Sequence, residues 1–274
     1  MSRKNLLNLF LLIIAAALAS IVFFSETSSD KLAPLSTIDI TAIKKITIQH
    51  NTHTTLIESQ RDGHWKLRQP VEIDANDFRI NSILKLVNAP VHSHYPLSDI
   101  DAETIGLDDP ATKITFDDHT ISFGSINPAT GLRYVQLDNT IYTIEDIYYP
   151  LISSNFSALV SLNLLPVDSH IDKLILINQT ITRGDDGLWR SNIAITADDV
   201  AGAIDHWQTL QAFGVHRYLE RKQLGEVFIY LTGQQQALRY LITDTDPWLI
   251  IARPETGLEY HLDIGAYDQL LAPQ

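Results

Sequence analysis

Paired histidines offer the first possible chemistry in this chain of 274 residues, ten of which are histidine. His92 and His94 are separated only by Ser93. Because alternate side chains of a β-strand share a face, this pair could present two imidazoles to one metal ion. No carboxylate stands beside them at a ligand-like spacing, and the chain has no His-Glu-x-x-His motif. A position on an edge strand explains the pair without metal.

Acidic pairs offer a second chemistry, general acid–base catalysis, which needs two carboxylates that converge in a cleft. Three acidic clusters stand where turns are expected: Asp108-Asp109-Pro110, Asp117-Asp118-His119 and Asp244-Thr245-Asp246-Pro247. Carboxylates in separate turns do not form such a pair. Ser125 follows Phe123-Gly124, but the Gly-x-Ser-x-Gly pattern of a nucleophile elbow is missing.

Composition excludes several further kinds of site and partner. The chain has no cysteine, which rules out disulfides, thiolate zinc sites, iron–sulfur clusters and cysteine nucleophiles. Its twelve glycines are scattered and form no phosphate-binding loop. A net charge of −13 repels phosphate backbones, so nucleic acid is not an expected partner. We predict no catalytic residue, no cofactor-binding residue and no metal ligand, and hence that the protein is not an enzyme.

The N-terminus indicates a membrane anchor. Arg3 and Lys4 precede an apolar run, Leu6–Phe24, that is long enough to cross a hydrocarbon core of about 30 Å as a helix. Positive charges favour the cytoplasmic side of a membrane. We therefore predict a transmembrane anchor at 1–25 and a linker at 26–39. This places the protein in the bacterial inner membrane as a single-pass protein, with a cytoplasmic N-terminus and a periplasmic body.

The alternative is a cleaved signal peptide. Ala17-Leu18-Ala19 resembles a signal-peptidase site, and a cut there would release a soluble protein. We favour the uncleaved anchor because the apolar run continues through Ile21–Phe24, whereas a cleavable segment usually turns polar before its cut site.

The body contains an internal repeat. Matches that keep nearly one spacing include Asp62-Gly63-His64-Trp65 with Asp186-Gly187-Leu188-Trp189, Ile80 with Ile204, Leu86 with Leu210, and His92 with His216. Matches in one order at one spacing are typical of a duplicated module. We predict module 1 at 40–165 and module 2 at 166–274, with module 2 a divergent repeat of module 1.

Each module shows the pattern of a mostly antiparallel sheet with one main helix. Asp74 and Asp77 in module 1, and Thr196 with Asp199 in module 2, stand where the helices are expected to begin. We predict that Trp65 and Trp189 are equivalent core residues. The late strands are expected at Lys113–Phe116, Thr120–Phe123, Arg133–Leu137, Ile141–Ile144, Glu226–Thr232, Ala237–Thr243, Trp248–Ala252 and Leu258–Leu262. The predicted fold class is α+β, with an N-terminal transmembrane helix followed by two repeated modules.

A short phrase also occurs twice, as PATGLRY at 128–134 and PETGLEY at 254–260. We interpret its Thr-Gly as an equivalent turn in each module rather than as a ligand-binding loop. Tyr148-Tyr149-Pro150 could face a partner, but we expect it to pack across the two modules.

Several motifs follow one another in an order that points to a known family. They are Asp62-Gly63-His64-Trp65 with Pro70, Ile105-Gly106-Leu107-Asp108-Asp109-Pro110, Phe123-Gly124 and Thr130-Gly131-Leu132-Arg133-Tyr134. In this order the chain resembles the bacterial family called domain of unknown function 4340. Module 2 lacks the Gly-Leu-Asp-x-Pro element. The resemblance implies a membrane segment and an extracytoplasmic body associated with transport or gliding-motility type ABC systems, and it implies no catalytic residue.

These observations favour an adaptor. We expect a membrane-anchored scaffold that binds an envelope membrane-protein complex, which the resemblance places as an accessory subunit of an ABC-type transport system. The alternative is an extracytoplasmic hydrolase or glycan-binding protein with a site between the two modules. A deep intermodule pocket with converging His and Asp side chains would favour the enzyme, and a flat exposed apolar face would favour the adaptor.

Overall fold

The computed structural model describes residues 12–18, 20 and 32–272. Residues 12–18 and 20 are helical. Within the described ranges, none of the helices is both long enough and apolar enough to span a membrane. Most of the predicted anchor at 1–25, and part of the predicted linker at 26–39, lie outside the described residues, so the anchor stays a prediction.

The body is built from short strands and a few helices. In module 1 the strands are β1 (Lys45–His50), β2 (His53–Ser59), β3 (Trp65–Gln69), β4 (Ile73–Asp74), β5 (Ser93–Pro96), β6 (Thr112–Phe116), β7 (His119–Ile126), β8 (Arg133–Leu137) and β9 (Thr140–Ile144). In module 2 they are β10 (Ile171–Ile175), β11 (Thr180–Arg183), β12 (Trp189–Ser191), β13 (Gly214–Arg217), β14 (Gly225–Leu231), β15 (Leu238–Asp244), β16 (Leu249–Arg253) and β17 (Leu258–Leu262). The α-helices are α2 (Asp77–Leu84), α3 (Tyr149–Ile152), α4 (Ala197–Thr209) and α5 (Ala266–Leu271), and the 3-10 helices are η1 (Ile40–Ala42), η2 (Lys85–Asn88), η3 (Leu97–Asp99), η4 (Phe156–Leu159) and η5 (Pro254–Thr256).

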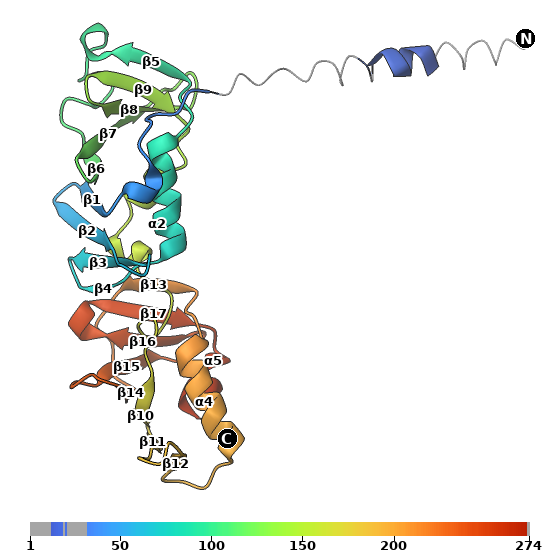
Figure 1. Cartoon of the computed structure of the whole chain (residues 1–274), viewed down its shortest axis with the longest axis vertical. Coiled ribbons are helices and arrows are strands. Elements are labelled where there is room, and N and C mark those ends of the chain that lie inside the picture. Colours follow the sequence, from blue (N-terminus) through green and yellow to red (C-terminus); the bar gives the residue numbers. More distant parts are fainter. Residues whose placement is uncertain (1–11, 19, 21–31, 273–274) are drawn as a thin grey trace, which may run out of the picture.

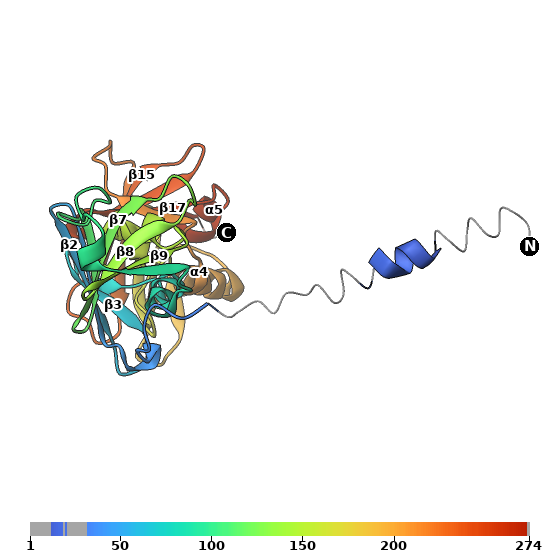
Figure 2. The ribbon, with the colours of Figure 1, turned by 90° about the horizontal axis from the view of Figure 1, so that it is seen from above.

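The strands form two antiparallel sheets, one in each module. The first has nine strands in the order β4-β3-β2-β1-β6-β7-β8-β9-β5, and the second has eight in the order β12-β11-β10-β14-β15-β16-β17-β13. The modules follow one another along the long axis, with α2 and α4 on the same side of the molecule (Figure 1). Seen from above, the modules overlap, as expected for an end-to-end stack (Figure 2).

The two sheets share one topology apart from β4. Strands β3-β2-β1-β6-β7-β8-β9-β5 take the same order as β12-β11-β10-β14-β15-β16-β17-β13, and in each module the main helix directly precedes the strand that ends this order. The α+β class with two antiparallel modules is therefore confirmed. Duplication of one ancestral module stays an interpretation, which the common strand order supports.

Both main helices begin close to the predicted residues, at Asp77 and after Thr196, whereas Asp74 lies in β4 and not at the start of α2. The Asn76 side chain caps α2 by accepting a hydrogen bond from the Arg79 N–H. In α4, Thr196 and Asp199 each accept a hydrogen bond from the other's backbone N–H, which is a capping box. The buried stripes are also as expected: Ile80, Ile83, Leu84 and Val87 in module 1, and Val200, Ala203, Ile204 and Trp207 in module 2.

The two matched tryptophans differ in burial. Trp65 is only 6% exposed and belongs to the core, whereas Trp189 is half-buried and packs against the core's margin. The reason lies in the sheets, because β3 is flanked by β4 while β12 has no strand beyond it. The prediction that Trp189 is an equivalent core residue is therefore wrong. The largest buried side chain of module 2 is instead Trp207, whose Nε1 donates to the Leu270 carbonyl at 3.0 Å.

The repeated phrase does not mark equivalent turns. Residues 127–132 join β7 to β8, whereas residues 254–257 join β16 to β17, which correspond in the common strand order to β8 and β9. Our interpretation of one structural turn used twice is therefore wrong. Gly131 and Gly257 both have positive φ, of 73° and 68°, so the same turn chemistry recurs at two different places.

The matching of His92 with His216 also fails. His94 lies opposite the third residue of β9, and Val215 lies opposite the third residue of β17. Val215 therefore takes the place of His94, because the link between the motif tryptophan and the main helix is shorter in module 2, from Trp189 to Ala197, than in module 1, from Trp65 to Asp77.

Residues 97–111, which join β5 to β6, cover the outer face of the first sheet, and we call them the covering segment. Ile105 and Leu107 form a small apolar cluster there with Ile141 of β9. Gly124 of β7 leaves room for this crossing, because a β-carbon at that position would collide with the Ile105 carbonyl oxygen and crowd the Leu107 side chain. The family-like motifs at 105–110 and 123–124 are therefore two halves of one packing arrangement.

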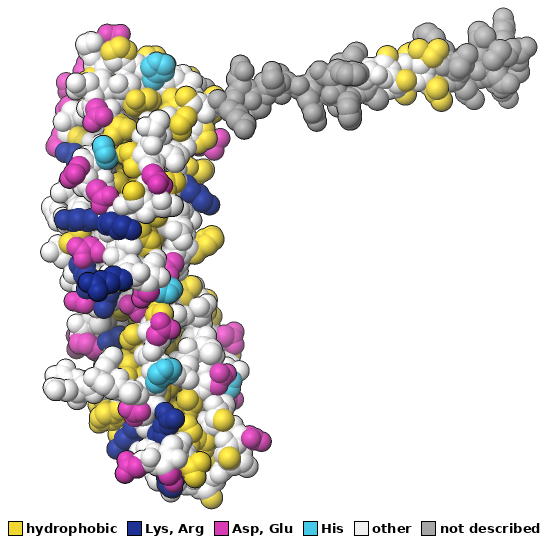
Figure 3. Space-filling view, viewed as in Figure 1, with side chains coloured by type: hydrophobic (Ala, Val, Ile, Leu, Met, Phe, Trp, Pro, Cys, Tyr) yellow, Lys and Arg dark blue, Asp and Glu magenta, His cyan; other side chains and the backbone are white. Residues whose placement is uncertain are grey.

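Surface charge is mixed despite the net charge of −13. On the face in Figure 3, acidic side chains are spread along the body, and a group of Lys and Arg side chains lies near mid-height, where the modules meet. This dispersion is typical of a solvated protein surface.

Candidate functional site

The histidine pair at the start of β5, of which His94 lies in the strand and His92 just before it, does not form a metal site with other side chains. His92 and His94 are both exposed, and the His94 ring lies beside Tyr142 with 6.5 Å between ring centroids. No group of three or more His, Cys, Asp or Glu side chains is placed to hold a metal ion anywhere in the described part of the chain. The absence of metal in the native protein stays a prediction.

In two of the three acidic clusters a carboxylate accepts hydrogen bonds from backbone N–H groups. Asp117 accepts hydrogen bonds from the N–H groups of Lys44 and Lys45, at 3.2 and 2.9 Å. Asp244 accepts from the Thr245 N–H at 2.8 Å. Ser125 donates its hydroxyl to the Ile105 carbonyl at 3.0 Å. These side chains hold turns and the covering segment, which agrees with the turn interpretation.

Of Tyr148-Tyr149-Pro150, Tyr149 packs inside module 1, so the expectation of packing across the modules is wrong for this residue. Its ring lies 5.7 Å from that of Phe123, and the Arg133 guanidinium carbon lies 3.7 Å from its centroid. Arg133 also forms a two-point ion pair with Asp146, with N–O distances of 2.5 and 3.1 Å. Tyr149 therefore completes the support of a buried arginine.

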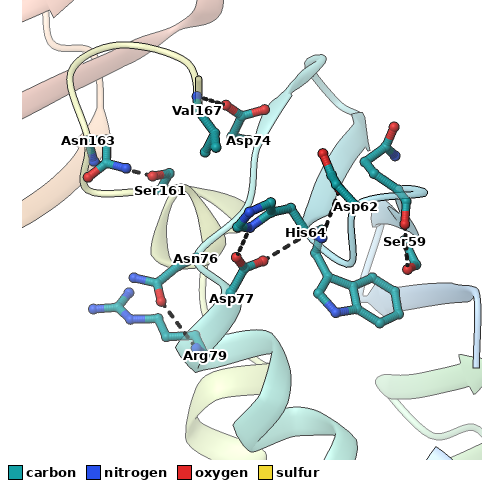
Figure 4. Close-up of polar contacts among 12 residues, drawn as sticks. Ser59, Asp62, His64, Asp74, Asn76, Asp77, Arg79, Ser161, Asn163 and Val167 are labelled. Carbon is teal, nitrogen blue, oxygen red and sulfur yellow. Dashed lines mark hydrogen bonds and ion pairs between the residues drawn. The ribbon is translucent and has the colours of Figure 1, made fainter. Parts of the chain in front are cut away.

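The two modules are joined by residues 155–167, which we call the junction segment. Its residues hydrogen-bond to both sides: Ser161 N–H donates to the Asp74 carbonyl at 2.9 Å, and the Ala212 N–H donates to the Leu162 carbonyl at 2.9 Å. The Val167 N–H donates to the Asp74 carboxylate at 3.0 Å, as Figure 4 shows. One apolar core also runs through both modules. The modules are therefore held in a defined arrangement.

A His–Asp pair lies close to the junction segment (Figure 4). His64 Nδ1 lies 2.6 Å from Asp77 Oδ2, and the other carboxylate oxygen accepts the Trp65 N–H at 2.9 Å. The hydrogen bond that His64 donates to the Asp77 carboxylate, followed by the negative charge of Asp77, raises the pKa of His64 above its ordinary value. Among the described residues no hydroxyl group hydrogen-bonds to His64. The pair thus ties the Asp-Gly-x-Trp turn to the start of α2 and lacks the nucleophile of a catalytic triad.

A cavity of about 500 Å³ opens where the modules meet, and we call it the junction cavity. His50 and His53 line it from the tip of the β1–β2 hairpin, and Arg217 lines it from the end of β13. Residues 153–156 complete the wall. No Asp or Glu is among its described lining residues. The sequence analysis raised a site between the modules as an alternative but named none of these lining residues for it, because they come from segments far apart in the chain.

A second feature missed by sequence is an aromatic cluster on module 2, made of Phe213, His216, Trp248 and His261. The ring centroids of Phe213 and Trp248 lie 5.7 Å apart, and those of His216 and His261 lie 4.5 Å apart. Phe213 is 55% exposed and Trp248 is 47% exposed. Two causes lower the pKa of His216 and so favour its neutral ring. The larger is burial, and the second is the neighbouring His261.

This module 2 aromatic cluster rests on a buried ion pair. Glu259 is 1% exposed, and both of its oxygens accept hydrogen bonds from the Arg221 guanidinium at 2.6 and 3.1 Å. His261 Nε2 lies 2.9 Å from Glu259 Oε1, which orients the ring in the cluster. Burial opposes ionisation of Glu259, but Arg221, the Leu219 N–H and His261 outweigh it and hold its pKa below the ordinary value.

Comparison with known proteins agrees with the motif order. The model of the family described as Domain of unknown function (DUF4340) matches residues 65–202, half of the chain, and the chain belongs to this family. The matched range begins at Trp65, runs through the rest of module 1 and ends within α4. No curated protein matches the chain, and no solved structure does.

Proposed function

We propose that this protein is a membrane-anchored extracytoplasmic adaptor that binds another envelope protein through the module 2 aromatic cluster. The observation that carries the proposal is the exposure of Phe213 and Trp248 side by side. Large exposed aromatic side chains are enriched at the centres of protein interfaces, where they bury much area at a low cost in side-chain entropy. The Glu259–Arg221 pair beneath them holds His261, and thus the cluster, in one orientation.

Module 2 has a further exposed apolar surface. A cavity of about 420 Å³ is lined by Ile177, Leu224 and Ile264, each of which is exposed, together with Thr245. Thr245 belongs to the same turn as Trp248, so the cavity lies close to the cluster along the chain. Exposed apolar side chains that gather in this way are typical of an interaction surface.

The hydrolase alternative lacks its expected constellation. The junction cavity contains two histidines, but none of its described lining residues carries a carboxylate that could act with them. This favours a binding role over a hydrolytic one. Attachment to the inner membrane is supported by the apolar run Leu6–Phe24, and association with an ABC-type transport system is supported by the family resemblance alone.

The test is photocrosslinking in native membranes. A photoreactive residue at Trp248 should capture a membrane protein, whereas the same residue at Phe78 should not. Phe78 is a suitable control because it is 80% exposed but lies on α2 of module 1. We also expect Phe213→Ala with Trp248→Ala to abolish copurification in mild detergent while leaving the thermal midpoint unchanged.

Two outcomes would contradict the proposal. Equal capture from Trp248 and Phe78 would indicate contacts without specificity. Copurification that survives the double alanine variant would place the binding surface elsewhere on the chain.

A further inference from the structure

We propose that the junction cavity binds a small ligand that carries one anionic group, a carboxylate or a phosphate, on an apolar body. This goes beyond the adaptor function, because the cavity is a separate site from the module 2 aromatic cluster. Its volume of about 500 Å³ lies in the range of sites for small molecules.

Both modules supply its walls. Module 1 contributes the tip of the β1–β2 hairpin and the turn at 153–155, and module 2 contributes Arg217. The junction segment fixes these parts relative to one another through hydrogen bonds to both modules. The cavity is therefore largely preformed, which lowers the entropy cost of binding.

The side chains that line the junction cavity favour an anionic ligand. Acidic residues outnumber basic residues in this protein, yet no Asp or Glu occurs among the described lining residues. Arg217 and His53 are both exposed, and neither forms an ion pair with any residue that the structure describes. Arg217 shares this with Arg61, Arg79 and Arg183 among the described arginines, whereas six others form ion pairs: Arg68, Arg133, Arg190, Arg221, Arg239 and Arg253. A guanidinium with free donors suits a two-point contact with carboxylate or phosphate.

The ring of His50 is held by two neighbouring side chains. Its Nε2 lies 3.0 Å from the Asn51 Nδ2, which is a donor, so Nε2 accepts that hydrogen bond. Its Nδ1 therefore carries the proton and donates to Thr112 Oγ1 at 2.7 Å. Because both ring nitrogens are occupied, recognition of the anion falls to Arg217 and His53.

The remaining walls suit the body of the ligand. Ile48, Pro70 and Phe156 supply apolar surface, while Ser154 and Asn155 supply polar groups. A free inorganic anion would leave the apolar surface unused. An anionic group attached to an apolar body satisfies both parts of the lining.

Titration calorimetry on the full chain in mild detergent tests this site. The probes are phenyl phosphate and benzoate, which separate the two anionic groups, and benzyl alcohol, which is neutral. We expect at least one anionic probe to bind, and benzyl alcohol to bind at least about tenfold more weakly. Arg217→Gln should weaken the anionic probe about ten- to hundredfold, because it removes a charge-assisted contact.

Arg183→Gln is the matched control, since Arg183 is an exposed arginine of β11 outside the cavity. It should leave the affinity unchanged, and the thermal midpoint of Arg217→Gln should equal that of the unaltered protein. No binding of either anion at about 10 mM would overturn the proposal. So would equal binding of benzyl alcohol, or an affinity that Arg217→Gln does not change. Copurification of the membrane partner is measured separately, so the adaptor function can stand if this site fails.

Discussion

Glu259 and Arg133 are charged residues that the fold places inside the body rather than on its surface. Glu259 is bound by Arg221, and Arg133 is bound by Asp146 and covered by Tyr149. Burying a charge is unfavourable unless it is paired and hydrogen-bonded. Both residues meet this condition, so they hold local geometry more than they add net stability.

The Glu259 pair makes stability depend on pH. Because the pKa of Glu259 lies below its ordinary value of 4.5 in the folded protein, its contribution is present above that pH. The contribution is lost as the pH falls through the folded pKa. We expect the urea-derived free energy of unfolding to fall more steeply below pH 4.5 in the unaltered protein than in Glu259→Gln. Parallel pH profiles for the two proteins would contradict this account.

The two motif tryptophans should differ in their effects on stability. Trp65→Ala should lower the free energy of unfolding by about 3–5 kcal/mol, because it empties a buried site. Trp189→Ala should cost about 1 kcal/mol, because that ring is half-buried on an edge strand. Urea denaturation measures both, with exposed Trp248→Ala as the control. Equal losses at the two motif positions would contradict the observed difference in burial.

At the scale of elements, each sheet is covered differently on its outer face. In module 1, residues 97–111 cross the sheet, and Ile105 and Leu107 pack against it. In module 2 the link from β13 to β14 is shorter, and its Arg221 reaches the buried Glu259 instead. An apolar contact in one module thus stands where an ion pair stands in the other. This explains why module 2 has no Gly-Leu-Asp-x-Pro element.

Gly124→Ala tests the covering segment. The added β-carbon would meet the Ile105 carbonyl, so the thermal midpoint should fall, with a cost of about 1–3 kcal/mol. Gly202→Ala is the control, because that glycine lies inside α4 with no neighbouring side chain close to the added carbon. It should raise stability by up to about 1 kcal/mol. An unchanged thermal midpoint in Gly124→Ala would show that the covering segment does not pack closely against β7.

At the scale of the whole molecule, the modules behave as parts of one body. The junction segment hydrogen-bonds to both, and the apolar core is continuous between them. We expect calorimetry to show one cooperative thermal transition. Two transitions, of which only one moves in Trp65→Ala, would indicate modules that fold separately.

The anchor can be tested independently of the body. Because the apolar run continues through Ile21–Phe24, we expect the mature protein to keep residues 1–20. Intact mass and N-terminal sequencing of protein from native membranes measure this. A mature chain that begins at Ser20 would contradict the anchor.

The sequence by itself determined the local structure and the family. Helix starts depend on side chains within a few residues, such as Thr196 and Asp199, and strand positions depend on a period-two pattern, so both were predicted correctly. Turns such as the one at Asp117 were also predicted, because their signals are local. The order of motifs then indicated the family.

Only the tertiary structure decided what depends on pairing between distant segments. Trp189 is half-buried because β12 ends its sheet, and the repeated phrase falls in different turns because strand order differs from sequence spacing. The junction cavity and the module 2 aromatic cluster arise in the same way, from side chains that share no local pattern, such as His53 with Arg217 and Phe213 with Trp248. Register and sheet edges are set by long-range hydrogen bonds and shared burial, which no short stretch of sequence encodes.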